Sequence, residues 1–375
     1  MRQFISIILV ILFLSLSLNL HLHIHSADIG VSAECAVLME AESGNVIYEK
    51  NADNRHLIAS TTKIMTAFVA IKNYDITQTV TVSEKAVGVE GSSIYLTKGE
   101  KLSMEDLLYA VMLESANDAA AAVAVEIAGS IEAFADMMNA EAKSIGLKNT
   151  NFTNPHGLDD SEHYSTAYDM AELTRHALSN NTFRTIAAAY KRVIPLKGDE
   201  GSRVLVNHNK MIKMYDGAIG VKTGFTKKSG RCLVSAAERD GIVLIAVTLN
   251  APDDWNDHKR MLDTGFAAYE RVLLTYAGDM SYVIPVINGD KDFIKCKNSE
   301  DLYAIVKSGD INITGIAEMK RFYYAPIIKG EQLGRIIFYN NGIEIGTAPI
   351  IADYDIEKFD HKFNLWDWIK EKWKK

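Results

Sequence analysis

The sequence predicts an α+β protein with an antiparallel sheet and packed helices, followed by a small all-β domain and a C-terminal amphipathic helix. Three observations support this fold class. Strand-like runs at both ends of residues 34–277 enclose apolar helices, and short apolar alternations fill residues 278–356. A tryptophan-rich segment then closes the chain, over residues 357–375.

Residues 1–33 are predicted to be an export signal peptide. Arg2 supplies positive charge, and residues 4–20 are almost wholly apolar. Val31-Ser32-Ala33 has the small-residue pattern of a cleavage site, and Ser26-Ala27 offers a poorer one. An uncleaved anchor is the alternative, although the apolar run is short for a membrane span. We therefore expect an exported protein on the outer face of the cytoplasmic membrane.

Residues 34–277 carry the strand and helix patterns of the first domain. A helix from Ser60 through Ile71 is apolar nearly all round, which indicates a helix buried in the core. Gly146 is a stop signal for a helix over residues 131–145. Other helices are predicted at 107–112, 119–127 and 168–178, and strands at 35–39, 46–48, 204–206, 219–222, 231–236 and 242–249.

Residues 278–356 read as a small all-β stalk domain. Asn341-Gly342 joins the apolar runs 336–339 and 343–345, which is a strong signal for a β-hairpin. No constellation of chemically reactive residues is found in this part of the sequence. We therefore assign it no catalytic role.

The segment Phe363–Lys375 is predicted to form an amphipathic helix. Leu365, Trp366, Ile369 and Trp373 fall on one arc of a helical wheel. The segment is short, rich in tryptophan and positively charged, which is typical of a helix lying at a membrane surface. The alternative is a helix docked on the protein's own domain.

Composition excludes several classes of function. The formal net charge is -8, and no basic stripe with aromatic residues is present, so nucleic acid is not an expected partner. The cysteines are Cys35, Cys232 and Cys296, an odd and sparse set that gives no disulfide framework. No His-Glu-x-x-His pattern occurs. We therefore expect no metal and no cofactor.

Three short motifs follow one another along the first domain: Ser60-Thr61-Thr62-Lys63, Ser115-Ala116-Asn117 and Lys222-Thr223-Gly224. Each is weak alone, since about one or two Ser-x-x-Lys matches are expected by chance in a chain of this length. The second pattern recurs at Ser17 and Ser179, and the third at Lys228 and Lys307. Those copies lie in the leader, in loops or turns, or in the second domain, so the context favours the first three.

The first motif is suited to nucleophilic catalysis. A serine and a lysine three positions apart share one face of a helix. The backbone N–H of Ser60, at the start of the helix, can help to hold an oxyanion. Lys63 lies on an otherwise apolar helix, where desolvation lowers a lysine pKa, so that its neutral amine can accept the serine proton. Most isolated Ser-x-x-Lys lysines are solvated surface residues, but a lysine on a buried helix needs another reason to be there.

The other two motifs supply groups for proton transfer and substrate binding. Ser115 can relay a proton to a leaving amine, and the Asn117 amide can bind a substrate carbonyl and steady Lys63. Alone, the pair reads equally well as a helix cap. Lys222 adds positive potential, the Thr223 hydroxyl can bind a terminal carboxylate, and Gly224 lets substrate lie along the strand edge. The backbone N–H of Phe225 is a second candidate oxyanion donor.

These residues resemble those of the serine-type D-Ala-D-Ala carboxypeptidases, the low-molecular-mass penicillin-binding proteins of peptidase family S11. The resemblance covers nearly the whole chain and includes Gly91-Ser92-Ser93, the segments 59–66, 154–158 and 165–169, and the run 220–226. It implies a penicillin-binding/β-lactamase-like catalytic domain, a β-rich stalk and an amphipathic membrane anchor. The implied substrate is a peptidoglycan stem peptide ending in D-Ala-D-Ala, and β-lactam antibiotics are the implied covalent inhibitors.

The resemblance also implies the role of each residue. Ser60 is the acylated nucleophile, Lys63 is its base, Ser115 and Asn117 form the second motif, and Lys222 with Thr223 holds the terminal carboxylate. Two departures from the family's pattern remain. Phe225 stands where some relatives carry histidine, and residues 250–254 lack the arginine found in relatives soon after the last strand, so a second cation for the carboxylate is unassigned.

Two other functions remain open at this point. One is a β-lactamase of the same fold, although the Glu-x-x-Leu-Asn segment that activates water in such enzymes is missing from the sequence. The other is a catalytically silent, membrane-bound protein that binds the cell wall or acts as a scaffold through a vestigial site.

Overall fold

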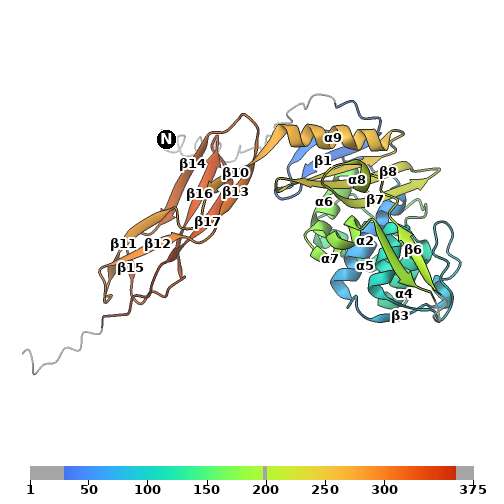
Figure 1. The fold of residues 1–375 in the computed structure, drawn as a ribbon, viewed down its shortest axis with the longest axis horizontal. Helices are drawn as coiled ribbons and strands as arrows, with labels where there is room; N and C mark the ends of the chain where they lie inside the picture. The colour runs from blue at the N-terminus through green and yellow to red at the C-terminus, as the bar shows by residue number, and fades with distance from the viewer. Residues whose placement is uncertain (1–28, 197–200, 360–375) are drawn as a thin grey trace, which may run out of the picture.

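The structure, a computed structural model, describes residues 29–196 and 201–359. Most of the predicted leader and the predicted C-terminal helix from Asp360 onward lie outside the described residues. Figure 1 shows a helix-and-sheet domain next to an elongated domain built of strands. Within the described ranges, no helix has both the length and the apolar character needed to cross a bilayer.

A five-stranded sheet forms the centre of the first domain. Its strands follow the order β2-β1-β9-β8-β7, and every neighbouring pair is antiparallel, as the sequence predicts. The central strands are nearly continuous apolar runs because helices cover both faces of the sheet. The strands are β1 (Cys35–Glu40), β2 (Val46–Lys50), β7 (Ala218–Thr226), β8 (Gly230–Arg239) and β9 (Ile242–Leu249).

Helix α2 (Lys63–Asn73) lies at the centre of the helical layer. It packs against all of the helices α3 to α7, so its residues from Lys63 to Ala70 are buried, in agreement with the all-round apolar pattern. The short 3-10 helix η1 (Ala59–Thr62) leads directly into it. The surrounding helices are α3 (Met104–Leu113), α4 (Asn117–Ala128), α5 (Ile131–Ser144), α6 (Ala167–Leu178) and α7 (Asn181–Ala188).

Helix α9 (Asp254–Ala268) contacts β1, β8 and β9, and the short helix α8 (Met211–Met214) contacts β7. Helix α9 was not predicted from the sequence. Its Gly265 lies so close to the sheet that an added Cβ would be 2.5 Å from Leu244 Cδ1. Glycine lowers helix propensity, but here it allows the helix to approach the strands.

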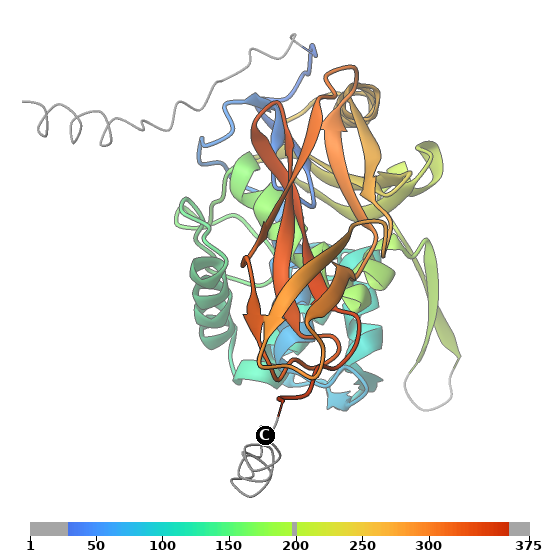
Figure 2. The same cartoon turned by 90° about the vertical axis from the view of Figure 1, so that its left-hand side faces the viewer.

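Small elements complete the first domain. The 3-10 helix η2 spans Glu84–Ala86, and strands β3 (Thr79–Thr81) and β4 (Lys101–Ser103) form one antiparallel pair. Strands β5 (Lys191–Pro195) and β6 (Ser202–Val206) form a second pair, which projects from the body of the domain in Figure 2.

The second domain consists of strands, as predicted. A six-stranded sheet has the order β14-β16-β17-β12-β11-β15, and β10 pairs with β13 beside it. Asn341 and Gly342, at φ +51° and +82°, form the turn between β16 and β17, which confirms the predicted hairpin. The strands are β10 (Tyr269–Thr275), β11 (Ser281–Ile287), β12 (Phe293–Asn298), β13 (Leu302–Lys307), β14 (Ile313–Met319), β15 (Tyr323–Tyr324), β16 (Gln332–Asn340) and β17 (Ile343–Ala352).

The boundary between the two domains differs from the sequence-based one. The sequence places it after Ala277, where turn residues begin. In the structure, β10 follows α9 directly and pairs with β13, so the strand Tyr269–Thr275 belongs to the second domain. Pairing with a strand farther along the chain decides the boundary, and the local sequence does not show it.

Candidate active site

Ser60 and Lys63 are in hydrogen-bonding contact. Ser60 lies in η1, and Lys63 begins α2; in a 3-10 turn, side chains three positions apart are eclipsed. The Lys63 Nζ atom is 3.0 Å from Ser60 Oγ. The structure therefore brings together the predicted nucleophile and the predicted base, although the α-helix begins three residues later than the sequence suggests.

The Lys63 amine has two further oxygen partners. Its Nζ lies 2.7 Å from Asn117 Oδ1 and 2.6 Å from the carbonyl oxygen of His156. Both of these oxygens can only accept hydrogen bonds. A neutral amine that donates to both has its lone pair left for the hydroxyl proton of Ser60, which is the arrangement that a general base needs.

The electrostatic surroundings favour that neutral amine. Lys63 is completely buried, and burial lowers its pKa well below the ordinary lysine value. The positive charge of Lys222 lowers the Lys63 pKa further, and the negative charge of Asp118 acts in the opposite direction. Lys63 of the first motif and Lys222 of the third motif therefore interact electrostatically, although they are far apart in the sequence.

The segment 154–158 holds Lys63 and α2 in place through backbone atoms. The carbonyl oxygen of Pro155 accepts a hydrogen bond from Thr66 Oγ1 at 2.6 Å, next to the His156 carbonyl that accepts from Lys63. Gly157 has φ +83°, and an added Cβ would be 1.9 Å from the carbonyl oxygen of Ala59. Only glycine therefore fits against the turn that carries Ser60.

Ser115 and Asn117 lie at the junction of α3 and α4. Ser115 is buried and has φ +59°, a left-handed conformation that is costly for a residue with a side chain and is often found at functional sites. Asn117 is fixed by its backbone N–H, which donates to Ser92 O at 2.7 Å, and by Nδ2, which donates to Glu90 O at 2.5 Å.

The third motif lies on β7, the edge strand of the sheet. Lys222 is buried, and its Nζ donates to the carbonyl oxygen of Thr223 at 3.0 Å. Burial lowers the pKa of Lys222 to about 7. An added Cβ at Gly224 would be 3.0 Å from the backbone nitrogen of Ser60, so the nucleophile turn packs directly on this strand.

A cleft of about 320 Å³ opens over these motifs. Five of the eight predicted site residues line it: Ser60, Ser115, Thr223, Gly224 and Phe225. The remaining three, Lys63, Asn117 and Lys222, are buried in contact with each other or with the lining residues. A larger cleft of about 790 Å³ is lined among others by Ser93, Glu114 and Arg203.

Several residues that line the cleft were not predicted from the sequence. They include His208, Arg231, Asp254 and Trp255. The Nε2 atom of His208 is 3.2 Å from Glu114 Oε2. Arg231 lies on β8 directly opposite Phe225 of β7, and its guanidinium pairs with Asp254 at the start of α9. No local pattern marks Arg231, Asp254 and Trp255, because they meet only when β8 and α9 are packed together.

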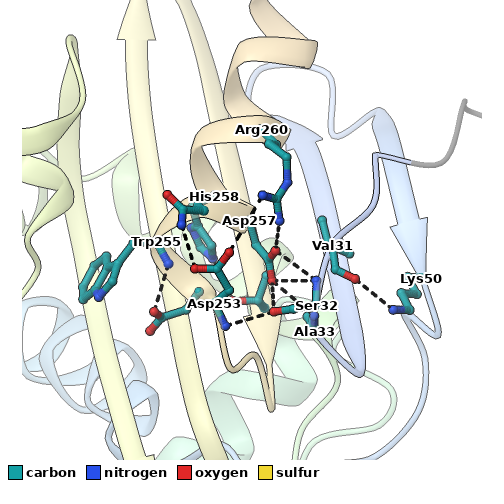
Figure 3. Close-up of polar contacts among 12 residues, drawn as sticks. Val31, Ser32, Ala33, Lys50, Asp253, Trp255, Asp257, His258 and Arg260 are labelled. Atoms are coloured by element: carbon teal, nitrogen blue, oxygen red, sulfur yellow. Dashed lines mark hydrogen bonds and ion pairs between the residues drawn. The ribbon is translucent and has the colours of Figure 1, made fainter.

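The start of α9 is fixed by a polar cluster shown in Figure 3. The buried carboxylate of Asp257 accepts hydrogen bonds from the backbone N–H of Ser32 at 2.9 Å and from that of Ala33 at 3.2 Å. It also pairs with Arg260. Trp255, which lines the cleft, lies on the same first turns of the helix, so the N-terminal segment helps to position one wall of the site.

Together, the hydroxyl of Ser60, a desolvated lysine amine and an adjacent strand edge form an arrangement suited to acyl transfer, with serine as the nucleophile and lysine as its base. Comparison with known proteins specifies the family. The model described as D-alanyl-D-alanine carboxypeptidase, Peptidase S11, matches residues 23–253, and that of the penicillin-binding protein 5 C-terminal domain matches residues 269–358. The chain belongs to the D-alanyl-D-alanine carboxypeptidase family.

Individual relatives agree with this assignment. The chain is 35% identical over 361 residues to the D-alanyl-D-alanine carboxypeptidase DacF of Bacillus subtilis, with 92% of each chain covered. It is 32% identical to DacA of Haemophilus influenzae, over 90% of this chain and 89% of that one. A crystal structure of penicillin binding protein 5 from Haemophilus influenzae matches with a TM-score of 0.69 at 29% identity, over 88% of this chain and 98% of that one.

These findings confirm the predicted fold, a penicillin-binding-like catalytic domain followed by an all-β domain, and the predicted function. The protein is a hydrolase with D-alanyl-D-alanine carboxypeptidase activity.

Proposed function

We propose that the enzyme is a serine-type carboxypeptidase that removes the terminal D-alanine from peptidoglycan stem pentapeptides through an acyl-Ser60 intermediate. One observation carries this proposal: Ser60 Oγ lies 3.0 Å from the Nζ of a completely buried lysine whose two other partners can only accept hydrogen bonds. A catalytically silent site would have no need of a buried lysine beside the serine.

In the first half-reaction, Lys63 takes the hydroxyl proton while Ser60 Oγ attacks the carbonyl carbon of the penultimate D-alanine. The peptide bond breaks, and Ser115 gives its hydroxyl proton to the leaving amine of the terminal D-alanine while it takes up the proton held by Lys63, so that Lys63 is neutral again. In the second half-reaction, Lys63 takes a proton from water, the resulting hydroxide attacks the ester, and the proton returns to Ser60. Only the terminal peptide bond has been cleaved, and the enzyme has returned to its starting state.

The remaining predicted residues bind the substrate. The backbone N–H groups of Ser60 and Phe225 hold the oxyanion, and the close packing of Gly224 against Ser60 supports this placement. Substrate lies along the free edge of β7 as an added strand. Thr223 and the positive potential of Lys222 hold its terminal carboxylate, and Asn117, besides steadying Lys63, binds the acyl-side carbonyl.

We also propose that β-lactam antibiotics acylate Ser60 and remain bound, because the sequence lacks the water-activating glutamate segment of β-lactamases. The apolar leader and the tryptophan-rich segment Phe363–Lys375 support an exported enzyme on the outer face of the cytoplasmic membrane, held there by a C-terminal amphipathic helix.

The test is to incubate the purified protein with a peptide ending in D-Ala-D-Ala and to measure free D-alanine. We expect release by the wild type, and loss of release together with loss of the penicillin adduct in Ser60→Ala, whereas Ser179→Ala serves as a control that keeps both. Absence of release with an intact Ser60 would refute the carboxypeptidase proposal. Rapid turnover of penicillin would favour the β-lactamase alternative.

A further inference from the structure

The catalytic cleft contains an arginine that the proposed mechanism does not yet use. Among the described residues that line this cleft, Arg231 is the only arginine. Its side chain is 44% exposed, so it faces the cleft rather than the protein interior. Residues 250–254, which follow the last strand of the sheet, supply no second cation for the substrate carboxylate.

Strand pairing places Arg231 on the same side of the sheet as Thr223. Side chains alternate along a strand, so Thr223 and Phe225 project from one face of β7. Arg231 is the direct cross-strand partner of Phe225. It is therefore the diagonal neighbour of Thr223, a separation of about 7–8 Å that a long side chain can bridge.

Asp254 holds the guanidinium in a fixed orientation. Arg231 Nε donates to Asp254 Oδ2 at 3.0 Å, and Arg231 Nη2 donates to Asp254 Oδ1 at 2.9 Å. Asp254 is itself buried and also accepts from the backbone N–H of Trp255 at 2.9 Å. A guanidinium has five N–H donors, so three remain after the two bonds to Asp254, including both on Nη1.

The pair is not an ordinary surface ion pair. An exposed pair holds two flexible side chains and contributes little to stability. Here, the carboxylate of Asp254 is buried, whereas the arginine side chain is 44% exposed. The Trp255 ring, 5.9 Å from the guanidinium, lies on the same helical turn as Asp254 and restricts the arginine further.

We propose that Arg231, oriented by Asp254, is the second carboxylate-binding cation and a specificity-determining residue that makes the enzyme select peptides with a free C-terminus. The proposal rests on the proposed function. Arg231 binds one carboxylate oxygen of the terminal D-alanine through Nη1, and Thr223 binds the other. A peptide with an amidated or extended C-terminus offers no anion to Arg231 and Thr223. Substitution of Arg231 therefore lowers kcat/KM for such a peptide only slightly. Asp254 is a positioning residue, since it acts through Arg231.

The test compares two matched substrates, one peptide with a free C-terminal carboxylate and the same peptide with a C-terminal amide. The variants are Arg231→Gln, Arg231→Lys and Asp254→Asn. Arg192→Gln is the control, because this arginine lies outside the cleft and pairs with Asp106. Thermal midpoints are measured for every variant, so that lost folding is separated from lost binding.

For Arg231→Gln we expect kcat/KM on the free-acid peptide to fall by about 10- to 100-fold, the range for losing a hydrogen bond to a charged group. The kcat/KM value for the peptide with a C-terminal amide should change by less than about 3-fold. Arg231→Lys should recover part of the loss, because lysine restores the positive charge but not the bidentate hydrogen-bonding geometry of the guanidinium. Asp254→Asn should raise KM for the free acid while leaving kcat nearly unchanged, and Arg192→Gln should change neither substrate.

Two failures are distinguishable. If the wild type releases no D-alanine from the free acid, the proposed function is wrong. If the wild type is active but Arg231→Gln reduces both substrates equally, or neither, then the Arg231–Asp254 pair only fixes the start of α9 and the inference is overturned.

Discussion

Ser32 Oγ donates a 2.7 Å hydrogen bond to Oδ2 of Asp257, which joins the N-terminal segment to helix α9 (Figure 3). The Asp257 side chain is completely buried, and it accepts hydrogen bonds from the backbone N–H groups of Ser32 and Ala33. Val31 and Ala33 are buried as well, and Val31 O accepts from Lys50 Nζ at 3.1 Å. Residues 31–33 are therefore part of the folded catalytic domain.

The first prediction concerns this contact. A form of the protein that begins at Glu34 loses the hydrogen bonds from Ser32 and Ala33, which leaves the Asp257 carboxylate buried with Arg260 as its main partner. We expect its free energy of unfolding to be about 2–4 kcal/mol lower than that of a form beginning at Ile29, because buried charges that lose partners are costly. Urea unfolding of the two forms measures the difference.

The same contact bears on the leader. Cleavage after Ala33 would remove Val31 and Ser32 from the folded domain, whereas cleavage after Ala27 would keep them. For the proposed exported form, we expect the mature chain to begin upstream of Val31, and intact-mass measurement of that form gives its first residue. A mature protein that begins at Glu34 and is as stable as the longer form would contradict this prediction.

The second prediction tests the neutral amine. In Lys63→Arg, the guanidinium keeps its charge at every accessible pH and cannot accept the proton of Ser60. We expect acylation of Ser60 by penicillin to slow by about 1000-fold or more, of the order attributed to general base catalysis. The measurement is the rate at which the adduct appears by mass spectrometry.

Lys72→Arg is the matched control for that experiment. Lys72 lies on the same helix, is half exposed and pairs with Glu141 at 2.8 Å. Its substitution should leave the acylation rate unchanged. An acylation rate in Lys63→Arg equal to that of the control would mean that Lys63 is not the base.

The third prediction concerns Gly91, which lies against the Asn117 amide. A Cβ added to Gly91 would be 2.7 Å from Asn117 Nδ2, whereas a Cβ added to Gly88 would meet nothing within 4 Å. Both glycines have positive φ, at +93° and +75°, so alanine is strained at both and costs about 1 kcal/mol of stability. Only Gly91→Ala should displace Asn117 from Lys63, and we expect its acylation rate to fall by about 10-fold or more while that of Gly88→Ala is retained.

Thermal midpoints and acylation rates of the two alanine variants, measured side by side, check this prediction. Equal loss of activity in both would show that strain in the loop, and not contact with Asn117, is responsible.

Local sequence patterns were sufficient for the core of the site. The apolar helix around Lys63 is visible in the sequence because burial on all sides removes polar residues from every face. The order of the three motifs identifies the residues that the fold brings together around the cleft. Ser60 and Lys63 are close in sequence, so their contact requires only one turn of helix.

The remaining parts of the site depend on tertiary packing. Arg231 and Asp254 are on different elements, and neither stands in a recognisable motif. The acceptor on His156 is a backbone carbonyl, which leaves no trace in residue type. Helix α9 was missed because Gly265 interrupts its helical pattern, although that glycine is required for close packing on Leu244.

The last prediction concerns acid stability. His156, His163 and His258 are buried, and burial lowers their pKa values to about 3, about 4 and about 3. Below pH 6.5, the unfolded chain binds protons at these histidines that the folded protein does not bind, so the free energy of unfolding decreases as the pH falls from about 6.5 toward 4. Above pH 6.5, both states are neutral and the three residues contribute no pH dependence.

A single substitution at His163 tests the direction of this pH dependence of the free energy of unfolding. Its Nδ1 accepts a hydrogen bond from the backbone N–H of Thr153 at 3.1 Å, and its Nε2 lies 2.7 Å from Thr62 Oγ1, so the folded protein holds the neutral ring. His163→Gln removes one proton site from the unfolded chain, and the stability lost between pH 7 and pH 5 should shrink by about 2 kcal/mol. Urea unfolding at the two pH values gives the comparison, and an equal loss in the wild type and in His163→Gln would mean that the buried ring takes up its proton without unfolding.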